Sequence, residues 1–358
     1  MTDVLRIRMP DDFHVHLRSG PMLQLVAPFT AAQCARALVM PNLEPTHVRA
    51  PEQVLAYRRE ILAATPGTNF TPLMTISLHD STTPDDIYRA HDTGCVVAAK
   101  AYPVGVTNAA SGVSDLRRLI PVYHAMAERK MVLSIHGELP GVDVDEAEQL
   151  FVSSRILLDI GVPGLKIVLE HVTTEESLRF IVSCSMRDLG FQIAATITAH
   201  HMLLTKEDWV GARLCPHHFC KPVAKTTAAR NALIRMAISG DSRFFLGSDS
   251  APHPLDRKEC GEVWPGVFTA PVLMEMLATV FDEHRALPQL ERFASCNGAE
   301  FYGLPCNEQL LQLERLSESV AISPCVTRTE GSGLELQRVA VRTIPKFAAS
   351  RWRARKIE

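Results

Sequence analysis

The feature that most constrains the fold is a series of short apolar, β-branched runs that alternate with stretches of helical spacing. Runs spaced in this way are typical of βαβ units that build a parallel sheet. Eight such runs occur, and eight strands alternating with helices predict a (β/α)₈ TIM barrel. The predicted strands cover residues 13–17, 37–40, 72–78, 95–101, 131–135, 166–169, 191–198 and 243–246, and the predicted helices include 51–64, 114–129, 144–160 and 174–187.

A chain of 358 residues has room for one large barrel or for two ordinary domains. The competing α/β architecture, a doubly wound open sheet, is favoured by a G-x-G-x-x-G or G-x-x-x-x-G-K-[ST] motif after a strand, and neither motif occurs. We therefore predict one barrel domain over residues 1–320 and a peripheral segment over 321–358. This segment is basic toward its end, which favours a solvated or poorly ordered tail over a binding tail.

Composition limits the possible partners and compartments. The formal net charge of −3 and a pI of about 6.5 give no electrostatic argument for nucleic-acid binding. Nine cysteines without paired spacing favour a reducing compartment, and no apolar run approaches the roughly 18 to 20 residues of a membrane span. The first residues lack the apolar core of a signal peptide, so we expect a cytoplasmic protein that acts on a small molecule.

Polar side chains occur where the apolar runs end. In a (β/α)₈ barrel the C-terminal ends of all strands meet at one mouth, which is where such folds place their chemistry. Residues far apart in the sequence are therefore expected to be neighbours at this mouth. They are His14, His16, Asn42, Lys100, His136, His171 and Asp249.

The pair His14 and His16 suggests a metal site. Side chains two apart on a strand point to the same side, which suits one ion. Alone, such a pair is more often two ordinary hydrogen-bonded histidines. Two further histidines and an aspartate at strand ends complete a set of imidazole and carboxylate ligands, which favours zinc or a related divalent metal.

Lys100 and Asp249 each have a structural and a functional interpretation. Lys100 ends an apolar run and could extend to the rim or pair with an acid. A desolvated lysine also loses its proton readily, and the neutral amine can add carbon dioxide to form a carbamate that bridges two metals. Asp249 could cap a turn, or it could bind metal and shuttle protons, with His253 pointing into the same mouth.

The sequence resembles the dihydroorotases of the shorter, monofunctional bacterial type, which belong to the amidohydrolase superfamily. The resemblance runs from about Leu5 to Pro305 and is absent after about Val320. The strings that carry it are PDDFHVHLR at 10–18, VMPNL at 39–43, FTPLMT at 70–75, AAKAYP at 98–103, HGE at 136–138, EHVTT at 170–174, ATIT at 195–198 and GSDSAPH at 247–253.

The resemblance implies two zinc ions and a set of ligands. His14, His16 and Asp249 would bind the more buried ion, His136 and His171 would bind the other, and Lys100, carbamylated to N6-carboxylysine, would bridge them. Arg18, Asn42 and His253 would hold the substrate carboxylate, backbone groups around His218 and Pro265 would orient the pyrimidine ring, and Thr107 would lie on a mobile loop over the substrate.

The implied reaction is the reversible cyclisation of N-carbamoyl-L-aspartate to L-dihydroorotate and water, in pyrimidine biosynthesis. Two metals lower the pKa of a bridging water and polarise the amide carbonyl, and Asp249 carries the proton. The family also implies a homodimer.

The chain departs from the family pattern at three places. The 104–108 loop has one threonine where the family has two, and it is a residue shorter. His218 replaces an apolar residue and adds an imidazole near the mouth, and Trp264-Pro265-Gly266 replaces a stretch richer in cysteine and glycine. The changed 104–108 loop bears on closure over the substrate and hence on turnover, whereas the predicted metal ligands are unchanged.

Four alternative interpretations remain. Cys215 to Cys220 could be a small zinc knuckle, although no second half lies nearby, and His200-His201 could begin a helix on the rim. The enzyme could be a hydantoinase or dihydropyrimidinase, although Arg18, Asn42 and His253 favour a substrate with a carboxylate. A catalytically silent scaffold is the fourth, although it would be expected to have lost ligands and none of the six is missing.

Overall fold

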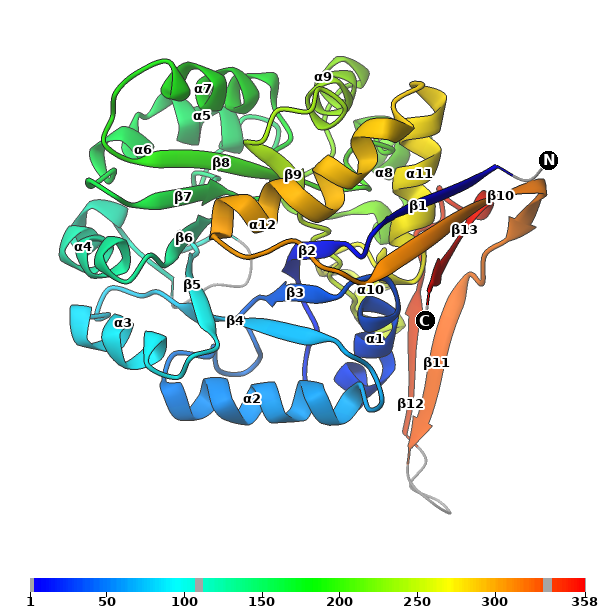
Figure 1. Cartoon of the computed structure of the whole chain (residues 1–358), viewed down its shortest axis with the longest axis horizontal. Helices are drawn as coiled ribbons and strands as arrows, with labels where there is room; N and C mark the ends of the chain where they lie inside the picture. Colours follow the sequence, from blue (N-terminus) through cyan, green and yellow to red (C-terminus); the bar gives the residue numbers. More distant parts are fainter. Residues whose placement is uncertain (1–2, 107–111, 331–336, 358) are drawn as a thin grey trace.

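The computed structural model describes residues 3–106, 112–330 and 337–357, and its centre is a barrel of eight parallel strands (Figure 1). Neighbouring strands follow the order of the chain from β2 to β9, and every predicted strand overlaps one of them. The predicted TIM barrel is thus confirmed. The strands are β2 (Asp11–Val15), β3 (Arg36–Val39), β4 (Thr71–Ser77), β5 (Val96–Ala101), β6 (Val132–Ile135), β7 (Lys166–Leu169), β8 (Gln192–Ile197) and β9 (Phe244–Leu246).

The barrel closes where the first and last of these strands meet. The Asp12 carboxylate accepts hydrogen bonds from the Ser248 backbone N–H at 2.7 Å and from the Ser248 hydroxyl at 2.6 Å. Two backbone bonds continue the contact, from Asp249 N–H to the His14 carbonyl at 2.8 Å and from His16 N–H to the Ser250 carbonyl at 3.1 Å. Closure therefore places the two ends of the predicted metal-ligand set side by side.

Apolar side chains fill the half of the barrel interior that lies away from the C-terminal ends of the strands. Phe13 and Phe245 meet edge to face with ring centroids 5.5 Å apart, and Tyr302 of α12 (Asn297–Tyr302) stacks on Phe13 at 4.5 Å. Helix α12 thus covers the end of the barrel opposite the strand C-termini. The remaining interior positions are Leu38, Met40, Leu73, Ala98, Val132, Val168 and Ala194.

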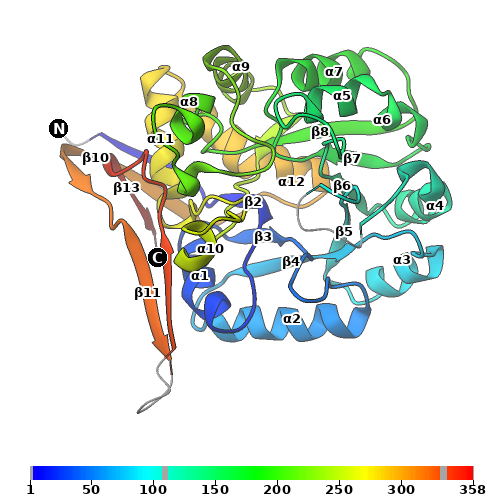
Figure 2. The ribbon, with the colours of Figure 1, turned by 180° about the vertical axis from the view of Figure 1, so that it is seen from behind.

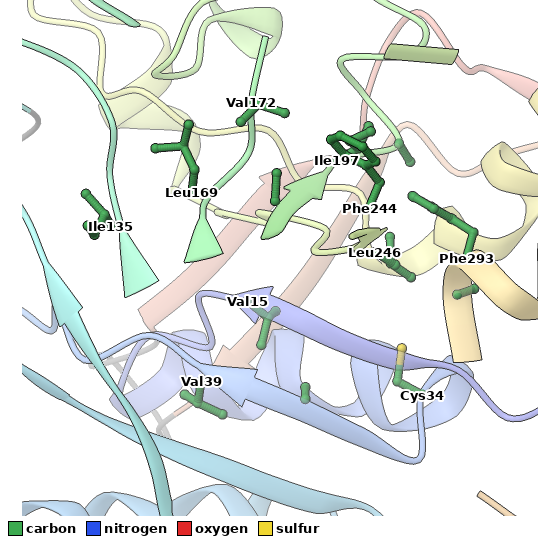
Figure 3. Close-up of a cluster of buried hydrophobic side chains, with 14 of the residues drawn as sticks. Val15, Cys34, Val39, Ile135, Leu169, Val172, Ile197, Phe244, Leu246 and Phe293 are labelled. Atoms are coloured by element: carbon green, nitrogen blue, oxygen red, sulfur yellow. The ribbon is translucent and has the colours of Figure 1, made fainter. Parts of the chain in front are cut away.

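A second apolar layer lies between the strands and the surrounding helices. Figure 3 shows part of it, with Val39, Ile135, Leu169 and Ile197 projecting from four strands of the barrel. All four are at most 1% exposed, as expected for strands covered on both faces.

The helices lie at the predicted positions, but one predicted helix is divided into two. Residues 51–64 form one helix, whereas 144–160 form two short ones, because Arg155 takes a positive φ of 61° between them. No described helix is long and apolar enough to cross a membrane. The helices are α1 (Gly20–Gln33), α2 (Pro51–Ala64), α3 (Pro84–His91), α4 (Ile120–Glu128), α5 (Ala147–Ser153), α6 (Ile156–Asp159), α7 (Glu175–Ser185), α8 (Lys206–Val210), α9 (Thr227–Ala237), α10 (Leu255–Lys258) and α11 (Leu273–Glu283), with short 3₁₀ turns between some of them.

The C-terminal segment adds two antiparallel sheets beside the barrel (Figures 1 and 2). Strand β10 (Leu310–Ala321) pairs with both β1 (Val4–Arg8) and β13 (Ala349–Lys356), so the two ends of the chain lie in one sheet. Strands β11 (Cys325–Glu330) and β12 (Gln337–Arg342) form a hairpin against α1. Where the domains divide remains a prediction, since β10 crosses the predicted boundary at residue 320.

The basic tail is an ordered strand, which corrects the expectation of a poorly ordered end. In β13 the side chain of Trp352 is 3% exposed, whereas Arg351 and Arg353 on either side face solvent. Arg355 pairs with Glu314 at 2.5 Å, and Arg315 stacks on the Trp352 ring with its guanidinium 5.1 Å from the centroid. The basic residues are therefore the solvated face of a strand.

We predict that Phe245→Ala destabilises the barrel by about 3–5 kcal/mol, because it empties space in a sealed interior. Urea unfolding followed by circular dichroism measures the change, with Met186→Ala as the control because Met186 is 84% exposed. A cost below 1 kcal/mol for Phe245→Ala would contradict this description of the interior.

Candidate active site

A cavity of about 660 Å³ opens at the C-terminal ends of the strands. Its wall contains five of the six predicted metal ligands, together with the predicted substrate-binding residues Arg18, Asn42, His253 and Pro265. The sixth ligand, Lys100, is fully buried on β5. The five ligands in the wall are His14, His16, His136, His171 and Asp249.

An irregularity in β2 directs His14 on the strand, and His16 just after it, toward this cavity. The register with β3 shifts between Asp12 and Val15, so one extra residue lies on β2. Such a bulge re-aims side chains, and here Phe13 lies in the apolar interior while His14 and His16 both reach the mouth. The imidazole Nε2 atoms of the two histidines are 3.3 Å apart, as the spacing predicted.

Asp249 completes a buried cluster with the two histidines. Its Oδ1 lies 3.1 Å from His16 Nε2 and 3.5 Å from His14 Nε2, and one ligand atom from each of the three residues lies within 4.8 Å of the others. Burial lowers the pKa of His16 to about 4, so this imidazole is neutral at pH 7, the form that binds a metal. The donor set of two imidazoles and one carboxylate suits zinc.

His136 and His171 lie beside this cluster. Their ring centroids are 4.7 Å apart, and the His171 ring lies 4.9 Å from that of His14. His171 Nδ1 is buried without a hydrogen-bond partner among the described residues, whereas His136 Nε2 lies 2.6 Å from the Glu138 carboxylate. A metal held by His136 would therefore use Nδ1 or replace the contact with Glu138.

Lys100 has no partner for its amine in the described structure. Its Nζ is buried, makes no hydrogen bond with a described residue, and lies 5.1 Å from the centre of the Tyr102 ring. Burial lowers the pKa of Lys100 to about 8, which increases the fraction of neutral, nucleophilic amine at pH 7. An unpaired amine of this kind fits the predicted carbamate, whose oxygens would satisfy the site.

Glu170 is a residue of the site that the sequence analysis did not single out. Its carboxylate is fully buried, accepts from the Ser134 hydroxyl and from Thr196 Oγ1 at 2.6 Å, and lies 2.8 Å from His14 Nδ1. A carboxylate on the second ring nitrogen fixes the tautomer of a histidine ligand and leaves Nε2 free to coordinate.

The sequence feature that could have identified Glu170 is its position two residues after Val168, whose side chain lies in the barrel interior. Side chains alternate along a strand, so the side chain at 170 also points inward. Gly247 permits this crowded layer, because a Cβ there would lie 2.7 Å from Thr196 Cβ and 3.0 Å from His14 Cβ.

Backbone strain is concentrated at the cavity. Six non-glycine residues in the described ranges have positive φ, and three of them are predicted site residues. These three are Arg18 at 61°, His171 at 41° and Asp249 at 43°. Each strained residue costs free energy and persists because the surrounding hydrogen bonds hold it, such as that from His171 N–H to Thr196 Oγ1 at 2.6 Å.

Arg18 and His253 form a cationic end of the cavity. Arg18 Nε donates to the Pro252 carbonyl at 2.9 Å, and its carbonyl accepts from the Tyr57 hydroxyl at 2.8 Å. One terminal nitrogen of the guanidinium lies 3.0 Å from His253 Nε2, and the same Nε2 lies 3.1 Å from the Pro265 carbonyl. Burial and the charge of Arg18 keep the pKa of His253 well below its ordinary value, so the imidazole is neutral near pH 7.

Lys258 supports the wall of the cavity that contains Pro265. Its buried ammonium donates to three carbonyls, those of Phe219 at 3.1 Å, Trp264 at 2.8 Å and Gly266 at 2.9 Å. The lysine thereby ties the segment after η2 (Pro216–His218) to the 264–266 segment. Nothing in the sequence pattern distinguished Lys258 from a surface lysine.

The His218 side chain points away from the mouth. Its Nδ1 donates to the Asp208 carbonyl at 2.9 Å, and its Nε2 accepts from Lys346 N–H at 3.0 Å, so the imidazole links α8 to the C-terminal segment. The expectation that His218 adds an imidazole to the mouth is therefore wrong. A contact between the backbone at residue 218 and the substrate remains a prediction. Thr107 lies outside the described residues.

Of the two expectations for the remaining histidine and cysteine motifs, the helix start at His200-His201 is wrong. His200 and His201 lie in a buried turn after β8, and the next helix begins only at Lys206, so they do not start a helix. The disfavoured zinc knuckle agrees with the structure, since no three described ligand residues gather within the segment from Cys215 to Cys220, and His217 contacts Glu259 at 2.8 Å instead.

Comparisons with known proteins agree with this geometry. No protein-family model matches the chain. It is 44% identical to a dihydroorotase of Erythrobacter litoralis over 336 residues, covering 92% of this chain and 95% of the relative. It is 46% identical to a dihydroorotase of Novosphingobium aromaticivorans over 322 residues, covering 88% and 91%.

Solved structures give the same result. Dihydroorotase of Saccharomyces cerevisiae, in complex with 5-fluoroorotic acid, superposes with a TM-score of 0.87 at 32% identity, covering 99% of this chain and 98% of that chain. L-Hydantoinase of Arthrobacter aurescens has a TM-score of 0.73 at 14% identity, covering 89% and 78%, and so shares the fold alone. The extent and identity of the sequence matches show that this chain belongs to the dihydroorotase family.

Proposed function

We propose that this protein catalyses the reversible cyclisation of N-carbamoyl-L-aspartate to L-dihydroorotate and water. The observation that carries the proposal is the shared cavity, in which the cluster of His14, His16 and Asp249 lies in the same wall as Arg18 and His253. The end of the cavity that holds the cluster suits hydrolysis of an amide, and the end that holds Arg18 suits binding of a carboxylate.

Arg18 would bind the substrate carboxylate. Its guanidinium is always charged and is held by the Pro252 carbonyl and His253, so it meets the ligand with little loss of side-chain entropy. Asn42 lines the same cavity and would donate a further hydrogen bond. A ring without a carboxylate gains nothing from this end, which favours dihydroorotate over a simple hydantoin.

Asp249 would move the proton. In the hydrolytic direction water adds to the amide carbonyl carbon, the carbon–nitrogen bond breaks, and Asp249 takes the proton from the water and delivers it to the departing nitrogen. In the biosynthetic direction the same proton returns from the ureido nitrogen through Asp249 to the leaving water. The position of Asp249 is fixed by its backbone N–H, which donates to the His14 carbonyl at 2.8 Å.

The donor set fits a binuclear zinc centre. His14, His16 and Asp249 would hold one ion, His136 and His171 the other, and carbamylated Lys100 would bridge them. Such a centre supplies Lewis-acid polarisation of the amide carbonyl and a water of lowered pKa. Glu170 and Glu138 would position His14 and His136 through their ring nitrogens.

We also propose that the protein is a cytoplasmic homodimer. The nine cysteines are free among the described contacts, which agrees with a reducing compartment. Analytical ultracentrifugation of the full chain tests the dimer.

Asp249→Asn should lower kcat in both directions by about 100- to 10,000-fold, because the amide cannot carry the proton. Coupled assays on dihydroorotate and N-carbamoyl-aspartate measure the change, and metal content on the same samples separates proton transfer from metal loss. Asp188→Asn, at an exposed position, is the control. Turnover within a factor of three of wild type would overturn the proposed role.

Arg18→Lys should lower kcat/KM for dihydroorotate by about 10- to 100-fold, mainly through KM, because an ammonium lacks the planar fork that binds a carboxylate through two parallel hydrogen bonds. Steady-state kinetics measure the effect, and Arg129→Lys on the surface serves as control. An unchanged KM would show that the carboxylate binds elsewhere.

Glu170→Gln should weaken metal binding about 10- to 100-fold, because the amide no longer fixes the His14 tautomer. Titration with a chromophoric chelator measures affinity independently of turnover. The exposed Glu318→Gln variant should behave as wild type. Equal affinity in all three proteins would remove the positioning role.

A further inference from the structure

A second group of potential metal ligands lies outside the cavity wall. It consists of His200 and His201, in the turn after β8, and Cys220, which follows η2. All three side chains are at most 2% exposed, and one ligand atom from each lies within 4.8 Å of the other two. None of the three is among the six ligands proposed for the binuclear centre.

His200 is the unexplained member of this group. Its ring is fully buried, and neither Nδ1 nor Nε2 has a hydrogen-bond partner among the described residues. An imidazole buried without any partner costs free energy, because both nitrogens have lost their bonds to water. Its ring lies beside that of His201, with the two centroids 4.3 Å apart.

His201 is oriented as a metal-binding histidine is. Its Nδ1 lies 2.9 Å from the Thr198 hydroxyl, so an N–H at this nitrogen can donate to Thr198 and leave Nε2 with a free lone pair. This Nε2 lies 3.4 Å from Cys220 Sγ. Sulfur and nitrogen ligands on one tetrahedral zinc ion, at bonds of about 2.3 and 2.05 Å, are separated by roughly 3.6 Å.

The Pro222 carbonyl oxygen offers a fourth ligand atom at the same point. It lies 3.0 Å from His201 Nε2 and 3.3 Å from Cys220 Sγ. Without a cation, the ring and the thiol can each donate to this carbonyl, so His201 and Cys220 are satisfied in either state. Without a cation, however, neither nitrogen of His200 has a hydrogen-bond partner among the described residues. A bound cation would give one of these nitrogens a partner, which favours a metal site.

We propose that His200, His201 and Cys220 bind one zinc-class divalent cation at a site separate from the active centre. Two imidazoles and a thiolate are the ligands that zinc prefers, whereas magnesium and calcium prefer oxygen. On binding, the Cys220 thiol would release its proton to solvent, and the single proton of the neutral His201 ring would lie on Nδ1, where it donates to Thr198. Burial raises the pKa of Cys220 to about 12, but a coordinating cation deprotonates a thiol outright.

The site would stabilise one wall of the cavity. Lys221 lines the cavity, and its two chain neighbours, Cys220 and Pro222, both belong to the second site. A cation there would fasten the segment that carries Lys221 to the end of β8. This role is structural, and it does not depend on the proposed reaction.

Cobalt substitution tests the site with a signal that the active centre cannot give. The full chain is stripped with a chelator and titrated with Co²⁺, and a thiolate-to-cobalt charge-transfer band in the near ultraviolet is sought. None of the six ligands of the proposed binuclear centre is a cysteine, so a bound Co²⁺ there gives no such band. Wild type should show the band, Cys220→Ser should lose it, and Cys215→Ser, on the same segment, should keep it.

Zinc content and diffraction supply a second, independent measurement. Zinc-loaded wild type should hold about one more ion per chain than Cys220→Ser, and anomalous diffraction at the zinc edge should show a peak between His200, His201 and Cys220. This peak requires no variant, so it decides the matter even if Cys220→Ser does not fold. Absence of the band and of the peak at saturating metal would overturn the proposal, whether or not the chain hydrolyses dihydroorotate.

Discussion

The site depends on the closure of the barrel between its first and last strands. The Asp12 carboxylate and two backbone hydrogen bonds hold β2 against the residues that follow β9. This contact joins residues more than 230 positions apart in the chain and brings His14 and His16 to Asp249. Without closure, the three donors would not meet.

The interior of the barrel is divided by depth into an apolar and a polar half. Alternation along each strand places Ala98 and Val168 in the apolar half, and Lys100 and Glu170 two residues further on in the polar half. The buried Glu170 carboxylate is stabilised by two hydroxyls and by His14. The Glu170 carboxylate can stay charged because these partners replace its bonds to water. Lys100 has no such partner, and burial lowers the pKa of its amine to about 8.

The sequence predicted much of this arrangement because it depends on periodicity. Each of the eight strands was placed, and polar residues at their ends were expected to meet because barrel topology brings strand ends together. Glu170 and Lys258 were missed for different reasons. Glu170 acts through His14, and the partners of Lys258 are backbone carbonyls that leave no residue signal.

The C-terminal sheets were also missed, in part because β10 pairs with β1 at the other end of the chain. Strand β13 does alternate, with Trp352 inward between outward arginines, but the excess of positive charge suggested a solvated tail. His218 shows a similar limit, because its side-chain direction is set by the Asp208 carbonyl and by Lys346, which is 128 positions away in the sequence.

The most direct test of the central claim compares three states of the same purified chain: as isolated, stripped by chelator, and reloaded with zinc. Each state is assayed with dihydroorotate, N-carbamoyl-aspartate and hydantoin. The account predicts that both natural directions disappear on stripping and return on reloading, with hydantoin a poor substrate. Zinc-loaded protein that cleaves hydantoin but not dihydroorotate, or a stripped protein that retains full activity, would contradict it.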